Sequence, residues 1–353
     1  MINYDNPDEK SALQAKFDAQ KIAFAPIVFQ ATKALRDFGI LELIRRNNGI
    51  TADDIAEQVD ISLYGVKVLL EVGLSSELLR LVDGKYVITK TGYFLLNDEL
   101  TKINMNFVND VCYQGMFDLQ TAIKDEKPTG LKVFGDWNTI YEALALLPKN
   151  VQKSWFEFDH FYSSIAFPEA LPIVFAKAPK HILDVGGNTG KLALQCVQYD
   201  PNVKVTILDT PALLKKAAEN AAEHGYEQRI FGHPINLLDE SNQFPENADV
   251  IWMSQLLDCF SPQQIVSILS RAGGVMNEAT SLYILETYWD RQRFEAAAFS
   301  LHNISLYFTC MANGNSKMYH SDEMKTCIDN AGLKVVAEHD NIGISHTLFE
   351  CKL

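Results

Sequence analysis

The sequence predicts an α/β protein in which a mostly parallel sheet follows a small helical domain that ends in a β-hairpin. From residue 181 onward, apolar strand-like runs alternate with helix-like segments, the pattern of a parallel sheet covered by helices on both faces. Between residues 31 and 96, helical periodicity gives way to two β-rich runs. The 353 residues are enough for two or three domains. We predict three parts, at residues 1–105, 106–178 and 179–353.

The composition excludes several classes of protein. With 45 acidic residues against 31 basic ones, the chain is a poor match for nucleic acid, whose phosphates are bound by cationic side chains. No apolar run approaches the ~20 residues of a membrane-spanning helix, and residues 1–10 do not resemble a signal peptide. The six cysteines form no C-x-x-C pair, which favours the reducing cytoplasm and disfavours a metal site: Cys112, Cys196, Cys259, Cys310, Cys327 and Cys351.

Residues 31–96 have the order of elements of a winged-helix domain. Thr51 is predicted to cap a helix, with Asp54 at the third position of a capping box. Asp83-Gly84, between two β-rich runs, predicts a two-residue hairpin turn. The helix that would enter the major groove of DNA carries Lys67 but also two glutamates. A dimerisation or scaffolding role is therefore favoured over DNA reading.

Residues 102–178 are predicted to be helical and rich in aromatic side chains, which concentrate in the stretch SWFEFDHFYSSIAFPEALP. An aromatic stripe of this kind usually belongs to the core. The functional alternative is one wall of a pocket for a flat or apolar substrate, because such pockets are lined mainly by apolar and aromatic groups. The candidates for that wall are Trp155, Phe158, Phe161 and Tyr162.

The strongest chemical signal is the loop DVGGNTG, residues 184–190, between a predicted strand and a predicted helix. Its glycines, Gly186, Gly187 and Gly190, allow the backbone to approach a ligand closely. A dinucleotide loop is disfavoured because Asn188 stands where the middle glycine of G-x-G-x-x-G would fall, and no G-K-[ST] follows. Asp184, at the strand end, suits a ligand with a cationic amino-acid moiety better than a pyrophosphate.

Polar residues at the ends of the next strands extend this site. Asp209 ends the strand VTILD and can accept hydrogen bonds from both ribose hydroxyls of an adenosine. Asn236-Leu237 precedes what we take as the third strand and can meet the adenine edge. Met253 and Ser254 end that strand, near where a methionine moiety would lie.

From about residue 20 to residue 353 the chain resembles the plant-type and bacterial small-molecule O-methyltransferases that carry an N-terminal winged-helix dimerisation domain. The resemblance rests on TADDIAEQ, DGKYVITKTGYFL, DVGGNTGKLALQ, VTILDTP, DVIWMSQLLD, SLYILET and SHTLFEC. It implies a Rossmann-like domain at 179–353 that binds S-adenosylmethionine through the glycine loop and Asp209. It also implies a homodimer formed through residues 1–105, with residues 106–178 connecting the domains and contributing to the substrate pocket.

The catalytic position departs from the family pattern. The family has His-Asp-Trp after the strand corresponding to Val250–Leu256, with the histidine as general base, whereas the matching residues here are Leu257-Asp258-Cys259. Leucine cannot accept a proton. Glu286 matches one of the two acids that orient the family's histidine, and Met318 or a neighbour stands in place of the other.

Three explanations of this departure stay open. His302 could be the base, since spacings of three to four predict that it shares one helix face with Ser305, Leu306, Thr309 and Asn313; the resemblance directs that face toward the substrate. Asp258 or Glu286 could instead take the proton from an acidic hydroxyl held in line with the methyl group. In the third explanation the fold binds the cofactor and catalyses other chemistry.

The sequence therefore predicts a cytoplasmic, homodimeric enzyme that transfers a methyl group from S-adenosylmethionine to a hydroxyl of a small aromatic molecule, without metal, membrane or nucleic acid. Asp258, Glu286 and His302 are the catalytic candidates, and Thr309 and Asn313 join the aromatic residues as candidates for the substrate pocket. One alternative is a cofactor-binding homologue with non-methylating chemistry, which the leucine at position 257 favours. The other is a winged-helix transcriptional regulator, which the acidic balance disfavours.

Overall fold

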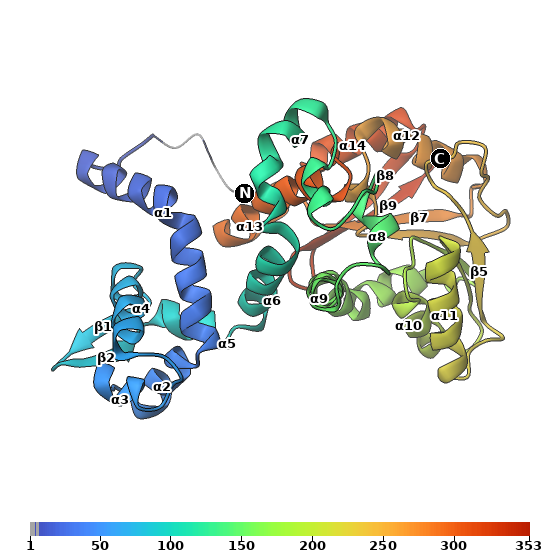
Figure 1. Cartoon of the computed structure of the whole chain (residues 1–353). Coiled ribbons are helices and arrows are strands. Elements are labelled where there is room, and N and C mark those ends of the chain that lie inside the picture. Colours follow the sequence, from blue (N-terminus) through green and yellow to red (C-terminus); the bar gives the residue numbers. More distant parts are fainter. Residues whose placement is uncertain (1–3, 5–6) are drawn as a thin grey trace. The chain divides into compact units, whose positions relative to one another are not determined.

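The computed structural model describes residue 4 and residues 7–353, which fall into two compact units, 4–109 and 110–353 (Figure 1). The three-part division made from the sequence stays a prediction. The N-terminal segment that does not resemble a signal peptide lies partly outside the described residues. No helix in the described parts of the chain is both long enough and apolar enough to cross a membrane.

The unit 4–109 consists of helices and one hairpin, in the order predicted for a winged-helix domain. Thr51 caps α3 by accepting from the Asp54 backbone N–H at 3.2 Å, as predicted. Asp83 and Gly84 both have positive φ and form the predicted hairpin turn. The elements are α1 (Ala12–Asp37), α2 (Ile40–Asn47), α3 (Ala52–Ala56), α4 (Leu63–Ser75), β1 (Leu79–Val82), β2 (Lys85–Ile88), α5 (Lys90–Asn97) and α6 (Glu99–Phe107).

Helix α1 of this unit is only partly covered. Leu35, near its C-terminal end, is buried in the unit's core with residues of α2, α3 and α4. Toward the other end, Leu13 and Ile22 are 80% and 76% exposed. The same helix lines an apolar groove of about 610 Å³, whose lining includes Phe17, Phe24 and Leu78. Apolar side chains left uncovered along a helix in this way are typical of an interaction surface.

The unit 110–353 begins with helical segments and continues into the α/β fold. The turn η1 (Val108–Cys112) spans the boundary between the two units. Next come η2 (Gly115–Asp118), α7 (Leu119–Asp125), η3 (Thr129–Val133), α8 (Ile140–Ala143), the long α9 (Lys149–Val174) and η4 (Phe175–Lys177). Helix α9 carries the aromatic stretch singled out in the sequence.

The sheet of this unit has the strand order β5-β4-β3-β6-β7-β9-β8. The first five of these strands are parallel to one another, and β9 pairs antiparallel with both β7 and β8, which confirms the mostly parallel sheet. The strands are β3 (His181–Val185), β4 (Lys204–Asp209), β5 (Ile230–Pro234), β6 (Val250–Ser254), β7 (Ser281–Glu286), β8 (Lys334–Ile342) and β9 (His346–Lys352).

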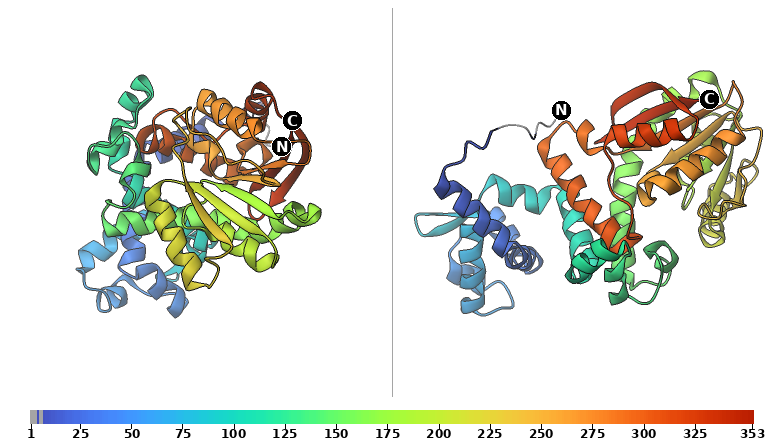
Figure 2. Two further views of the ribbon diagram at one scale, coloured as in Figure 1. Left: turned by 90° about the vertical axis from the view of Figure 1, so that its right-hand side faces the viewer. Right: turned by 90° about the horizontal axis from the view of Figure 1, so that it is seen from above.

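Helices cover both faces of the sheet (Figures 1 and 2). Alternate residues of the central strands pack into two cores, one on each face. Leu183 and Ile284 pack with α12 (Pro262–Gly274) and α14 (Ser321–Asn330). Ile182 and Leu285 pack on the other face with α9, α10 (Lys191–Tyr199) and α11 (Pro211–Glu223). The strands read as continuous apolar runs because both faces are covered.

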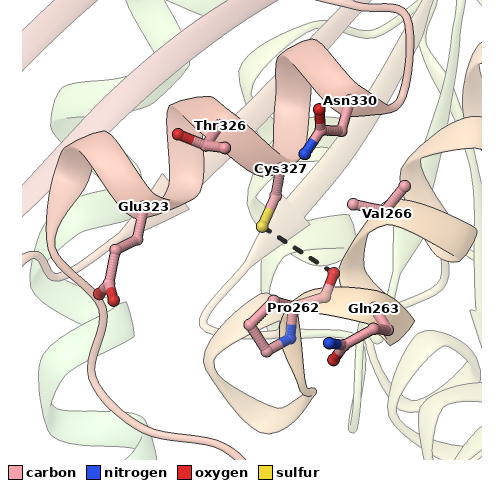
Figure 3. A pocket seen from close by; sticks show the side chains of 7 residues that line it. All are labelled: Pro262, Gln263, Val266, Glu323, Thr326, Cys327 and Asn330. Atoms are coloured by element: carbon pink, nitrogen blue, oxygen red, sulfur yellow. Dashed lines mark hydrogen bonds between the residues drawn. The ribbon is translucent and has the colours of Figure 1, made fainter.

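Helices α12 and α14 leave a surface hollow between them, of about 340 Å³ (Figure 3). At its floor the Cys327 thiol lies 3.9 Å from the carbonyl oxygen of Pro262. Glu323 and Asn330 stand at its rim in the same view. The hollow is part of the seam where the two helices pack over the sheet.

Two local features differ from the sequence predictions. The strand β5 was not foreseen, because its sequence IFGHP contains a glycine and a proline and only its first residue is buried; such a strand is tolerated at a sheet edge. Asn236, which was predicted only to precede the strand at Val250–Ser254, thus also follows the additional strand β5. Helix α13 (Glu295–Tyr307) changes into a π-helical turn, η7 (Phe308–Ala312), so the single face predicted to run from His302 to Asn313 does not continue past Tyr307.

We expect His346, the first residue of β9, to make folding sensitive to acid. Its ring is completely buried, and burial lowers its pKa to about 4. Between pH ~6.5 and ~4, His346 is therefore protonated in the unfolded chain but neutral in the folded chain. The free energy of unfolding consequently falls as the pH falls. In urea unfolding at pH 7.5 and 4.5, the wild type should lose up to ~3 kcal/mol more than His346→Leu.

The exposed His224 provides the matched control for this measurement. His224→Gln should follow the wild type at both pH values, since that ring is in solvent in both states. An acid sensitivity of His346→Leu equal to that of the wild type would show that His346 is not responsible.

Candidate functional site

The site lies where the carboxyl ends of β3 and β6 meet. The chain runs from β3 to β4 and β5 on one side, then returns to β6 on the other side of β3. Ligands of such sheets bind at this reversal of strand order, outside the carboxyl ends of the strands. The glycine loop follows β3 here, and the segment Gln255–Cys259 follows β6.

The glycine loop is held close to its neighbours on both sides. A Cβ on Gly187 would lie 2.5 Å from Oδ2 of Asp184, and one on Gly186 would lie 2.6 Å from Cδ1 of Leu256, so neither position accepts a side chain without a shift. The contact with Leu256 also shows that the loop after β3 touches the segment after β6. Gly190 ends the loop as the N-cap of α10.

Asp184 is a buried carboxylate beneath this loop. Its side chain is 2% exposed, and Oδ2 has no hydrogen-bond partner in the described structure. Burial, with a smaller contribution from the charge of Asp209, raises its pKa to about 7. An orphaned buried acceptor of this kind is costly in the free protein and marks a place where a donor group from a ligand fits.

Asp209 ends β4 and faces the same loop. Its Oδ2 accepts from the Asn188 backbone N–H at 2.9 Å, and its Oδ1 accepts from the Thr210 N–H at 2.7 Å. Burial raises its pKa even though these two hydrogen bonds oppose the shift. The carboxylate is thus fixed in orientation against the loop, with lone pairs left for a ligand.

Asn236 and Leu237 lie one step beyond the end of β5. The preceding residue, Ile235, donates its N–H to the carbonyl of Asp209 at 3.1 Å, which places the segment beside Asp209. The Asn236 amide oxygen accepts from the Leu238 N–H at 3.0 Å and shapes a local turn. Arg271 of α12 donates to the Leu237 carbonyl and so ties this turn to α12.

Met253 and Ser254 end β6 as predicted, but they differ in environment. Met253 is completely buried in the core. The Ser254 hydroxyl and the Gln255 amide oxygen are buried without a hydrogen-bond partner in the described structure. Together with Asp184, they make three orphaned polar groups at the junction of β3 and β6, which indicates a ligand-binding position.

The turn after β6 is fixed by Glu286, the last residue of β7. One oxygen of its carboxylate accepts from the backbone N–H groups of Leu256 and Leu257, at 2.9 and 2.8 Å. The side chain is 1% exposed and its second oxygen has no partner in the described structure. Burial, and then the neighbouring charge of Asp258, raises the pKa of Glu286 well above its ordinary value.

Within this turn, η5 (Leu257–Cys259), Leu257 and Asp258 have different surroundings. Leu257 is completely buried in the apolar core, whereas Asp258 lies among polar groups. The Cys259 thiol donates to Oδ1 of Asp258 at 3.4 Å, and the Tyr141 hydroxyl interacts with that thiol. Burial raises the pKa of Asp258 to about 7. The turn therefore presents a carboxyl group that titrates near neutral pH.

Asp159 of α9 is a site residue that the sequence analysis missed. Its Oδ2 accepts from the Asn188 side-chain amide of the glycine loop, at 3.4 Å. Its charge also acts on Asp258, so it lies near both the glycine loop and the catalytic turn. The one signal in the sequence for a site residue here is an acidic side chain within a helical segment that is otherwise rich in aromatic residues. This segment was interpreted only as an aromatic stripe.

The ring of His302 packs against Trp289, with ring centroids 4.8 Å apart, and His320 packs against the same indole at 4.8 Å. Met318, which with its neighbours was predicted to stand in place of the family's second acid, receives the Thr287 hydroxyl on its sulfur at 3.6 Å. Whether Met318 or a neighbour occupies that position stays a prediction.

The candidate pocket residues divide into two groups. Trp155 donates its indole N–H to the Tyr307 hydroxyl at 2.7 Å, linking α9 to α13. Tyr162 packs against both Phe158 and Phe161. The two polar candidates differ in the bonds they make. The Thr309 hydroxyl donates locally to the Ser305 carbonyl at 3.0 Å, whereas the Asn313 amide donates to the Cys259 carbonyl and so ties η7 to the turn after β6.

Two family models match the chain. A Dimerisation2-like domain matches residues 16–86, and an O-methyltransferase domain matches residues 117–334. The second match covers more than half of the chain and contains the glycine loop, Asp209, the catalytic turn and Glu286. These matches do not favour a non-methylating homologue or a transcriptional regulator.

Individual proteins agree with this assignment. The L-tyrosine C(3)-methyltransferase of Streptomyces lavendulae is 21% identical over 315 residues, covering 88% of this chain and 85% of its own. Acetylserotonin O-methyltransferase 1 of Oryza sativa subsp. japonica is 26% identical over 281 residues, 73% of each chain. The crystal structure of the S-adenosylmethionine-dependent methyltransferase SibL superposes with a TM-score of 0.72, at 21% identity, over 94% of this chain and 97% of that one.

The sequence, the sheet topology and the family models lead to one assignment. The resemblance stated from the motifs, the fold class and the cofactor class are confirmed. The roles of the individual site residues stay predictions. The chain belongs to the family of S-adenosylmethionine-dependent O-methyltransferases with an N-terminal dimerisation-like domain.

Proposed function

We propose that this protein methylates a hydroxyl group of a small aromatic molecule and that Asp258 accepts the proton which that hydroxyl loses. The observation that carries the proposal is the contact between two segments: the glycine loop over Asp184 touches the turn that presents Asp258. A methyl donor held by the first segment would face a proton acceptor on the second.

The residues of the glycine loop fit S-adenosylmethionine. Gly187 leaves the space above Asp184 that a side chain would fill, and the orphaned Oδ2 of Asp184 suits a cationic amino-acid moiety. The fixed carboxylate of Asp209 would accept from the ribose hydroxyls, with Asn236 and Leu237 beside the adenine. When bound, the cofactor supplies a methyl group made electrophilic by its sulfonium.

Asp258, rather than a histidine, would take the acceptor's proton. A carboxyl group with its pKa near 7 is deprotonated often enough, and is basic enough, to act as a general base at physiological pH. Glu286 would act as a positioning residue, because its carboxylate fixes the backbone of the turn that carries Asp258. Leu257 belongs to the core and takes no part in the chemistry.

The aromatic residues of α9 support an aromatic acceptor. Trp155, Tyr162 and the neighbouring phenylalanines belong to the same helix as Asp159, which contacts the glycine loop. The rice relative is named for methylating acetylserotonin on oxygen, and the Streptomyces relative is named for methylating carbon 3 of tyrosine. Methylation at a ring carbon next to an ionised hydroxyl is therefore the second candidate, and NMR of the product distinguishes an O-methyl from a C-methyl group.

The uncovered apolar side of α1 supports a homodimer formed through residues 4–109. Leu13, Ile22 and the groove beside Phe17 and Phe24 present apolar surface that a second copy would cover. The acidic balance of the chain supports a protein that works without nucleic acid. The six cysteines, free in the structure, support a reducing compartment such as the cytoplasm.

We expect Asp209→Ala to lose most of its affinity for S-adenosylmethionine and S-adenosylhomocysteine. The substitution removes a charged acceptor from the ribose, so the Kd should rise by ~10- to 100-fold in calorimetric titration. Binding of wild-type strength by this variant would remove Asp209 from the cofactor site, and no binding by the wild type would overturn the proposed function.

A pair of glycine variants tests the same site without touching a charge. Gly187→Ala places a methyl group against Asp184 and should weaken cofactor binding. Gly274→Ala, at the end of α12 where nothing lies within 4 Å, should bind as the wild type does. Melting temperatures of both variants separate a local effect from loss of the fold.

Asp258→Asn should lower kcat by ~10²- to 10⁴-fold while leaving S-adenosylhomocysteine binding intact. An amide cannot accept the proton, but it keeps the size of the side chain. In the wild type, kcat/KM should rise with pH and level off above about 7, because the carboxyl group must be deprotonated to act. A variant with unchanged kcat would assign the base to another residue.

Light scattering at micromolar concentration should give about twice the chain mass of 39.7 kDa. Ile22→Glu and Phe24→Glu together should shift the protein to the monomer mass, because two carboxylates replace apolar side chains on the uncovered side of α1. A wild-type mass near 40 kDa would refute the dimer.

A further inference from the structure

Asp159 is a carboxylate in the active site that the proposed reaction does not use. It lies on α9, one turn after Trp155, and its side chain is 29% exposed. The hydrogen bond from Asn188 is long, at 3.4 Å, and involves only Oδ2. The carboxylate therefore has free acceptor capacity.

No cation in the described parts of the chain neutralises Asp159 directly. The closest ionisable side chain is His160, whose Nε2 lies 3.9 Å from Oδ2 of Asp159, but burial lowers its pKa to about 4 and so keeps the ring neutral. Lys191, at the start of α10, acts on Asp159 through its charge without reaching ion-pair distance. A carboxylate left in this state costs free energy unless a ligand supplies the positive charge.

Other acidic side chains of the site would also be stabilised by a positively charged ligand. Asp258 and Glu286 are buried acids whose charged forms are disfavoured by burial, and the second oxygen of Glu286, which is 1% exposed, has no partner in the described structure. The charge of Asp159 acts on Asp258 and on the Tyr307 hydroxyl, which binds Trp155. Those groups belong to the acceptor side, whereas Asp184 lies beneath the glycine loop on the donor side.

We propose that the acceptor carries an ammonium group and that Asp159 binds it. This inference rests on the proposed function and names its substrate class: an aromatic hydroxyl compound with a positively charged amine. An acceptor with a carboxylate would bring a second negative charge beside Asp159 and be repelled. Aromatic side chains on α9 favour a cation for a second reason, since the faces of their rings attract positive charge.

Binding of three matched phenols tests this without requiring turnover. Tyramine, para-ethylphenol and para-hydroxyphenylpropionate share one ring and carry a cationic, a neutral and an anionic tail. Each is titrated into the full-length protein saturated with S-adenosylhomocysteine. Tyramine should bind ~10- to 100-fold more tightly than para-ethylphenol, as expected for a charged hydrogen bond in a partly buried site, and para-hydroxyphenylpropionate should bind most weakly.

Asp159→Asn should remove the advantage of tyramine over para-ethylphenol and leave the affinity for para-ethylphenol within about twofold of the wild type, since only the charged bond is lost. The matched control is Glu157→Gln on the same helix, where Glu157 pairs with Lys153 at 3.6 Å. This control should keep the preference for tyramine.

Two readouts separate this inference from the proposed function. If S-adenosylhomocysteine does not bind the wild type, the proposed function fails. If it binds, but tyramine has no advantage or does not bind, only the ammonium inference is overturned. A loss of S-adenosylhomocysteine affinity in Asp159→Asn with an unchanged tyramine preference would also overturn it, because Asp159 would then serve the donor.

Discussion

The two hydrogen bonds that Glu286 accepts from Leu256 and Leu257 connect strand β7 to the turn after β6. A buried carboxylate that accepts two backbone N–H groups fixes the path of the main chain more firmly than apolar packing does, because its geometry is directional. The turn is thereby placed against Gly186, and Asp258 is directed away from the core that holds Leu257. The position of Asp258 relative to the glycine loop depends on this link.

The site concentrates acidic side chains. Burial raises the pKa values of Asp184, Asp209, Asp258 and Glu286, so each of these groups resists ionisation until a positive or hydrogen-bonding ligand arrives. A ligand that binds such groups gains more than it would in water, since the surrounding protein screens charge weakly. Ligand affinity is thus obtained at the expense of stability, as is common at functional sites.

Much of the fold, and the positions of the candidate cofactor residues at the ends of strands, could be predicted from the sequence, because both depend on local patterns. The glycine loop, Asp209 and the strands β3, β4, β6 and β7 follow from apolar runs and the residues that end them. Strand β5 could not be predicted, because its stability comes from pairing with β4 and not from its own composition. Nor could the change from α13 to the π-helical turn, which displaces Asn313 from the face of His302.

Asp159 illustrates a different limit. Its sequence neighbours are aromatic, and nothing in that pattern shows that α9 crosses beside the glycine loop, 29 residues further along the chain. The contact with Asn188 exists only because the helix and the loop are brought together by tertiary packing. Residues of this kind become visible only when distant segments are placed in space.

Strand β9 lies inside the sheet, hydrogen-bonded to β7 on one side and to β8 on the other. Its residue Thr347 pairs with Glu286, so the carboxylate that organises the catalytic turn sits on a strand completed from both sides only when residues 346–352 have been made. During synthesis, the glycine loop and its parallel strands emerge long before this last partner. A chain interrupted before β9 would keep the glycine loop and its parallel strands but lack the strand that pairs with Glu286, so the turn after β6 is secured only once β9 has been made.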